Sequence, residues 1–209
     1  MTRRWLFADQ LGPHFLDGPD QDVLLIESKA VFARRRFHRQ KAHLVLSALR
    51  HRATELGARA TLVRSETYAP AVHAAGDGLS VCAPTSHAAR ALVAGLPVQV
   101  LPARGFATGE ADFAAWVAGR GDRRLLLEDF YRDARRRHDV LMDGTEPAGG
   151  RWNFDADNRE PPPKGAGTLG VPEPRWPAED DIDAEVRRDL DRWESAGEVS
   201  FVGRDGPRW

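Results

Sequence analysis

Short apolar runs alternate with helical patterns along the first half of this chain. Five of these runs have the length and the β-branched or aromatic content of buried strands. They cover residues 5–7, 23–26, 60–63, 79–82 and 98–101. Strands that are buried on both faces read as continuous apolar runs, so the series predicts parallel strands.

Helical periodicity between the runs completes a βαβ pattern. Over residues 37–56, apolar positions recur near a spacing of 3.6, and Gly57 stands where a helix C-cap is expected. A shorter helix is predicted over residues 88–94, with Thr85 or Ser86 as its N-cap. The fold class that follows is α/β, with a doubly wound, Rossmann-like sheet of five parallel strands.

Two further helices are predicted beyond the last strand, over residues 111–118 and 125–141. The first carries an apolar side that includes Trp116, and the second carries one that includes Phe130. We assign both helices to a first domain that spans residues 1–141.

Residues 142–209 are expected to form a connector that is helical and rich in Pro and Gly. Its stretch up to Trp176 carries aromatic side chains that need burial, so we expect it to lie pinned along the sheet domain. A helix over about residues 178–196 carries one apolar stripe, made up of Ile182, Val186, Leu190 and Trp193. This stripe packs on the sheet domain, is shielded by self-association, or stays exposed, and the sequence leaves the three arrangements open.

Composition limits the partners and cofactors that the chain is expected to bind. The formal net charge of -1 predicts no general attraction to nucleic acid. Cys82 is the only cysteine, so the chain can form no internal disulfide and cannot supply the four thiolates of an iron–sulfur cluster. The segment that begins at Met1 has no long apolar run, which predicts neither a signal peptide nor a membrane span, and therefore a cytoplasmic location.

No motif points to a catalytic or metal-binding residue. The histidines are scattered without the spacing of a metal site, and no serine lies in a nucleophile elbow. The pattern GxGxxG does not follow the first strand, so a pyrophosphate site is unsupported there.

Polar residues follow two of the predicted strands. Asp9, Gln10 and Leu11 come directly after the first strand, and Glu27 ends the second. In open α/β sheets, ligands bind beyond the carboxyl ends of the strands, so Asp9, Gln10 and Glu27 are candidates to bind a polar heterocycle or a sugar. The alternatives are a turn stabilised by Asp9 and an exposed loop charge at Glu27.

Several segments together resemble one family. They are DQL after the first strand, the glutamate that ends the second, FHRQKAHLVLSALRHRATEL, EDFYRDARRRHDVLMDG and GGRWNFDADNR. In this order they are similar to the N-terminal α/β domain of the iron–sulfur bacterial cryptochromes and prokaryotic (6-4) photolyases. The likeness extends over nearly the whole chain, and its last two motifs are specific to that group.

The resemblance implies an antenna domain. In that family the α/β domain holds 6,7-dimethyl-8-ribityllumazine, while a helical domain holds FAD and a four-cysteine [4Fe–4S] cluster and binds damaged DNA. By position, the pocket residues implied here are Phe7, Asp9, Gln10, Leu11 and Glu27. We expect neither FAD nor the cluster in this chain, and contact with DNA only through the missing domain.

One departure concerns the pocket. Many relatives carry a tyrosine seven residues after the glutamate, and Arg34 stands there in this chain. Another flavin-like chromophore and an empty pocket therefore remain alternatives to the lumazine. Two other functions also stay open, namely a stand-alone α/β protein that binds a small molecule, and an interaction module that docks through the stripe.

Overall fold

The computed structural model describes residues 2–156, 159, 161, 164–165, 172 and 177–206, so Trp176 lies outside the described residues. The chain forms two compact units. One consists of Met1–Gly105 with Arg175–Trp209, and the other of Phe106–Pro174.

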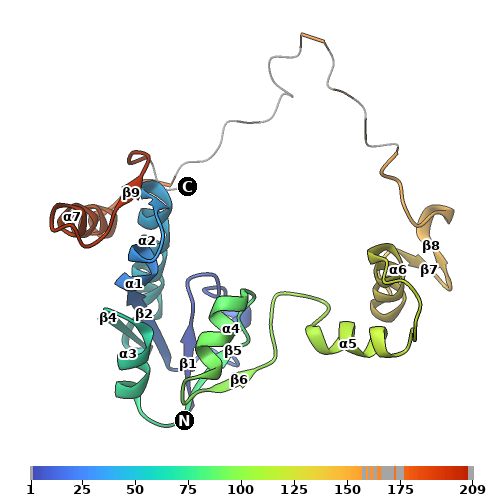
Figure 1. Cartoon of the computed structure of the whole chain (residues 1–209), viewed down its shortest axis with the longest axis horizontal. Helices are drawn as coiled ribbons and strands as arrows, with labels where there is room; N and C mark the ends of the chain where they lie inside the picture. The colour runs from blue at the N-terminus through green and yellow to red at the C-terminus, as the bar shows by residue number, and fades with distance from the viewer. Residues whose placement is uncertain are drawn as a thin grey trace. The chain divides into compact units, whose positions relative to one another are not determined.

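The first unit contains a sheet of five parallel strands, which confirms the predicted fold class (Figure 1). The strands are β1 (Arg3–Leu6), β2 (Val23–Ser28), β4 (Ala60–Ser65), β5 (Leu79–Cys82) and β6 (Gln99–Leu101). Their order is β4-β2-β1-β5-β6. The chain thus builds outward from β1 first in one direction and then in the other, and strand order reverses between β1 and β5.

Helices cover both faces of this sheet, and alternate strand residues feed two separate cores. Trp5 and Phe7 pack with residues of α3 (Tyr68–Ala75) and α4 (His87–Ala94) on one face. Leu6 packs with residues of α2 (Arg39–Leu56) on the other. The remaining short elements of this unit are α1 (Lys29–Ala33), β3 (Phe37–His38), β9 (Phe201–Val202), η1 (Pro13–Phe15) and η2 (Gly57–Arg59).

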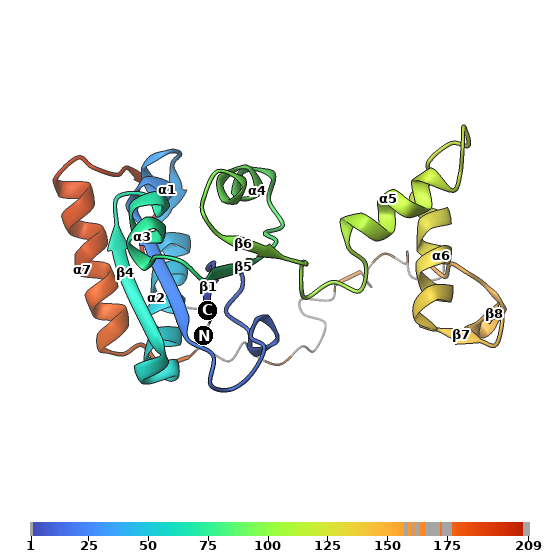
Figure 2. The same cartoon turned by 90° about the horizontal axis from the view of Figure 1, so that it is seen from below.

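The last helix, α7 (Asp181–Ser195), packs along α2 (Figure 2). Val186 and Leu190 are fully buried there against residues that include Leu46, and Trp193 is half-buried at the edge. The apolar stripe is therefore covered within the chain, the first of the three arrangements that the sequence left open. The units also divide differently from the expected boundary at residue 141, because this packing joins α7 to the sheet.

Ion pairs reinforce the contact between α2 and α7. The guanidinium of Arg39 is buried and donates to Asp191, to Glu194 at 2.9 Å and to Asp205 at 2.8 Å. Its Nε and two amino groups each meet a different carboxylate, two from α7 and one from the segment after it. Because the guanidinium has several donors in a rigid plane, one side chain can hold all three acceptors.

The second unit contains α5 (Glu110–Ala118) and α6 (Leu127–His138), followed by the hairpin β7 (Met142–Asp143) and β8 (Glu146–Pro147) and by η3 (Ala148–Gly150). Rings of Phe113, Trp116 and Phe130 pack together between α5 and α6. Arg135 is buried and donates to the carbonyls of Val140, Leu141 and Trp152. This arginine thereby anchors the GGRWNF segment to α6.

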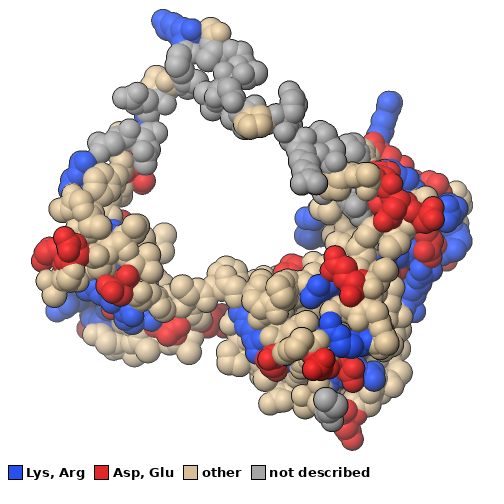
Figure 3. All heavy atoms as spheres, turned by 180° about the vertical axis from the view of Figure 1, so that it is seen from behind, with Lys and Arg blue, Asp and Glu red and all other residues tan. Residues whose placement is uncertain are grey.

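Charged side chains are mixed in sign over the surface of the first unit. Figure 3 shows Lys and Arg interspersed with Asp and Glu on the face turned away from the viewer of Figure 1. Among the helices of the described residues, none combines the length and the apolar character needed to cross a membrane.

Burial of the stripe leads to a stability prediction. Replacing Leu190 with alanine should lower the free energy of unfolding by about 2–5 kcal/mol, because it removes a fully buried side chain and leaves a cavity between α2 and α7. Urea unfolding followed by circular dichroism measures this change. Arg188→Ala on the exposed side of the same helix is the control, with an expected change within about 0.5 kcal/mol. Equal effects of the two substitutions would show that α7 is not packed in solution.

Candidate functional site

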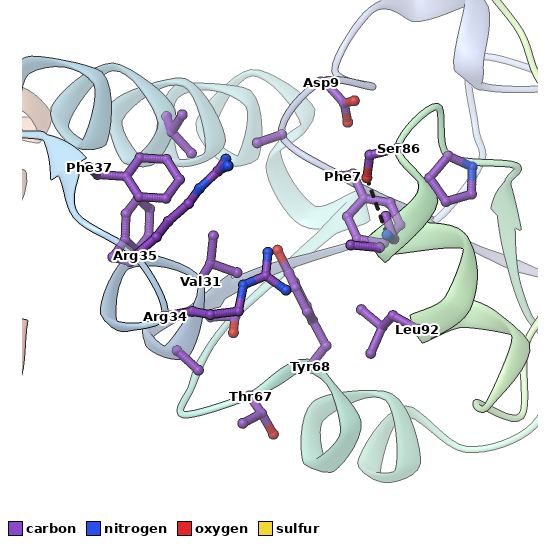
Figure 4. A pocket seen from close by; sticks show the side chains of 18 of the residues that line it. Phe7, Asp9, Val31, Arg34, Arg35, Phe37, Thr67, Tyr68, Ser86 and Leu92 are labelled. Carbon is purple, nitrogen blue, oxygen red and sulfur yellow. Dashed lines mark hydrogen bonds between the residues drawn. The ribbon is translucent and has the colours of Figure 1, made fainter.

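A cavity of about 520 Å³ lies at the carboxyl ends of the strands in the first unit. Its wall is formed by the end of β1, by α1 and the start of α2, and by the first residues of α3 and α4 (Figure 4). Because β1 and β5 diverge in their connections there, the cavity occupies the position where α/β sheets bind ligands. Its volume is also in the range of about 300–1,000 Å³ that is usual for small-molecule sites.

Phe7 and Asp9 reach this cavity from the end of β1. Phe7 continues the side of β1 that carries Trp5, and the two ring centroids are 4.4 Å apart. Tyr68 at the start of α3 packs edge-on against Phe7 at 5.6 Å. Figure 4 shows Phe7 and Tyr68 on one side of the cavity and Asp9 nearby. The structure therefore brings two of the predicted residues to one site.

Gln10 and Leu11 turn away from the cavity. The side-chain Nε2 of Gln10 donates to the carbonyl of Cys82 at 3.1 Å, and its backbone N–H donates to the carbonyl of Phe7 at 2.9 Å. Leu11 packs with the core on the α2 face. Both residues therefore fix the turn that presents Asp9, because Gln10 ties that turn to the end of β5.

Glu27 does not line the cavity, which corrects the expectation that it joins Asp9 there. It lies within β2 with its side chain on the α2 face, where it is 3 % exposed. Its two oxygens accept hydrogen bonds from Nε and an amino group of Arg50 at 2.7 and 2.9 Å. The next residue, Ser28, points to the opposite face and lines the cavity. Glu27 is thus part of a buried ion pair.

That ion pair extends into a cluster. The same guanidinium of Arg50 donates to Asp189 of α7 at 2.6 Å and lies 3.3 Å from Glu185. Arg64 on β4 approaches Glu27 at 3.6 Å from the solvent side. The hydrogen bonds to Glu27 and Asp189 raise the pKa of Arg50 despite its burial. The cluster joins β2, β4, α2 and α7, so its role is structural.

Tyr68 and Arg34 were not predicted as site residues. Burial, with the nearby charge of Asp9, raises the pKa of Tyr68 to about 12, whereas the charge of Arg34 lowers it. The phenol is therefore neutral and able to donate a hydrogen bond near neutral pH. Figure 4 shows the Arg34 side chain beside Tyr68. The strand-end rule, applied after β4, would have led to Tyr68.

The donor groups of the cavity suit binding more than catalysis. Ser28, Thr67 and Ser86 contribute hydroxyls, and Asp9 contributes a carboxylate. Among the described residues, no histidine or cysteine lines the cavity. The arrangement can hold a flat ring with polar substituents.

A separate group of possible metal ligands lies at the start of α7. His51, Asp180 and Asp183 have ligand atoms within 4.8 Å of one another. However, Asp180 accepts hydrogen bonds from the backbone N–H groups of Ile182 and Asp183, and His51 lies 2.9 Å from its other oxygen. The hydrogen bond with His51 and these backbone bonds lower the pKa of Asp180. The group therefore caps the helix.

Comparison with known proteins identifies relatives over most of the chain. Residues 4–200 match the family model described as deoxyribodipyrimidine photo-lyase-related protein. A protein named (6-4) photolyase from Agrobacterium fabrum (strain C58 / ATCC 33970) is 35% identical over 181 residues, which cover 75% of this chain and 35% of the relative. The chain thus spans about a third of the length of this relative. The matched range includes both the cavity and the ion cluster of Arg50.

The ion cluster generates a prediction for Glu27. Glu27→Gln keeps the shape of the side chain but removes its charge, so Arg50 loses the carboxylate that accepts two of its hydrogen bonds in a buried site. We expect the free energy of unfolding to fall by about 1.5–3 kcal/mol. Chemical denaturation measures it, with Glu66→Gln, an exposed partner of Lys29, as the control at about 0–1 kcal/mol. If both glutamates prove equally tolerant, the structural role assigned to Glu27 is wrong.

Tyr68 yields a prediction for high pH. The chain has two tyrosines, and ultraviolet absorbance in a pH titration reports ionisation of both. Subtracting the curve of Tyr68→Phe from that of the wild type should leave a transition near pH 12. Since this pKa is raised on folding, the stability due to the neutral phenol is complete below pH 10, the value of the unfolded chain, and is lost as pH rises towards 12. A difference curve centred at pH 10 would mean that Tyr68 is solvated.

Proposed function

This chain belongs to the deoxyribodipyrimidine photo-lyase-related protein family, and we propose that it serves there as the domain that binds a light-harvesting chromophore. The observation that carries this proposal is the cavity at the switch point of the sheet, with an aromatic wall and several polar groups. Flat heterocycles bind in such places because rings cover their faces and a few polar side chains orient their edges.

The lumazine named above fits the residues that are present. Phe7 and Tyr68 offer ring faces and edges, and the neutral phenol of Tyr68 offers a hydrogen bond to a ring oxygen or nitrogen. Ser28, Thr67 and Ser86 offer hydroxyls suited to a ribityl chain. When bound, such a chromophore absorbs near-ultraviolet or blue light and passes the excitation to a flavin. The residues of this chain would hold it, orient it and exclude water from its ring.

We further propose that the chain does not repair DNA by itself. The named relative is about three times as long as the part that matches, so the flavin and the contact with damaged DNA would belong to the unmatched portion. The single cysteine supports this division, because a [4Fe–4S] cluster normally needs four thiolates. In this proposal the partner of the α/β domain is a helical FAD domain.

Two other functions are supported by fewer observations. A stand-alone protein that binds a small molecule would use the same cavity. That function differs from the proposed one only because no light-dependent partner is involved. An interaction module was expected to dock through the stripe of α7, but Val186 and Leu190 are covered by α2 and are not available for that purpose. The chromophore-binding function therefore accounts for more of the observed features.

Binding measurements test the proposal directly. The purified chain should bind 6,7-dimethyl-8-ribityllumazine or a flavin one to one, as followed by fluorescence and equilibrium dialysis. Tyr68→Phe should raise the dissociation constant about two- to tenfold, because a hydrogen bond in a partly buried site is lost. Tyr131→Phe, in the other unit, is the matched control and should leave it unchanged. Failure of every such heterocycle to bind would refute the function.

A further inference from the structure

Three cationic residues are among those that line the cavity. Arg34 and Arg35 follow α1, and Lys41 lies in the first turn of α2. In the part of the chain that the structure describes, none of the three forms a salt bridge. Arg35 and Lys41 instead lie 5.1 and 5.8 Å from the ring centroid of Phe37. Figure 4 shows Arg34 extending into the cavity and Arg35 running alongside Phe37.

This arrangement differs from that of Arg39 and Arg64 in the same unit. Arg39 contacts three carboxylates, and the half-exposed Arg64 contacts Glu185 at 2.5 Å. Asp9 is the one carboxylate among the described residues of the cavity wall. Three cations against one carboxylate leave a net charge of about +2 at the site.

The backbone adds positive potential in the same place. Both α3 and α4 begin at the cavity, and neither has an acidic residue in its first turn. Helix N-termini carry partial positive charge and favour anions, which supports the preference that the side chains create.

The opposite side of the cavity is apolar. Phe7 and Leu92 present a ring and an aliphatic group there. A ligand that satisfies both parts must have a flat ring at one end and a negative charge at the other. Guanidinium groups bind phosphate oxygens through paired hydrogen bonds, so a phosphate is the anion that two adjacent arginines suit best.

We propose that the cavity prefers a ring ligand whose side chain ends in a phosphate over the uncharged ribityl compound. This inference rests on the proposed function, because it specifies the ligand of the same site. In this arrangement Arg34, Arg35 and Lys41 hold the phosphate, while Phe7 and Tyr68 contact the ring.

Riboflavin and flavin mononucleotide make a matched pair of probes, since they differ only by the phosphate. Isothermal titration of the whole chain should show tighter binding of the mononucleotide by about ten- to a hundredfold at low salt. The preference should shrink as ionic strength rises, because the cations are exposed. The double substitution Arg34→Gln and Arg35→Gln should abolish the preference while riboflavin binding remains.

The control is Arg36→Gln, which removes an exposed charge of the same run that does not line the cavity. It should keep the full preference, and circular dichroism verifies that all variants fold. Equal binding of riboflavin and its phosphate would overturn this inference and leave the proposed function intact. Inorganic phosphate that binds as tightly as the mononucleotide would also overturn it, because the ring would then contribute nothing. Absence of binding by the flavins and the lumazine would refute the proposed function itself.

Discussion

A buried carboxylate must be neutralised, and the way in which Arg50 neutralises Glu27 organises the first unit of this protein. Two hydrogen bonds of 2.7 and 2.9 Å join the strand to the helix, and a third of 2.6 Å reaches Asp189. Removing Glu27 or Arg50 would leave the other charge buried with fewer compensating partners, which costs more than the pair itself contributes. Together with the apolar packing of Leu190 and the ion pairs of Arg39, this guanidinium holds the sheet, α2 and α7 as one body.

The two faces of the sheet consequently carry different tasks. On the α2 face, Glu27 enters the charge cluster of Arg50, and α7 packs on α2 through Leu190. On the α3 and α4 face, the helices are only 8 residues long and leave room beyond the strand ends. Adjacent residues of β2 serve the two faces in turn, because Glu27 enters the ion cluster and Ser28 enters the cavity wall.

Sequence reasoning predicted the sheet because continuous apolar runs mark buried strands, and it predicted α2 because a long 3.6-residue periodicity marks a helix. It missed α1 and α3, since a five-residue helix and a short helix containing Pro70 have little periodicity and form through their contacts with the sheet. The strand-end rule found Asp9, and the family resemblance added Phe7. It misplaced Glu27 because β2 continues through Ser28, beyond the apolar run, so the glutamate lies inside the strand and not at its end. The alternation of side chains along β2 then decides which face of the sheet Glu27 points to, and the identity of the residue does not indicate this face.

The order of the segments along the chain has a consequence for biosynthesis. Arg50 and Asp189 are 139 residues apart in the sequence. All residues of the second unit are translated after the strands of the sheet and before α7. At about 5–20 residues per second, a ribosome needs roughly 7–28 s to deliver α7 after α2 has emerged. During that interval the face of α2 that bears Leu46 and Arg50 has no cover, and the sheet cannot reach its final stability. The nascent chain is thus most exposed to proteases and to aggregation while the inserted unit is being made.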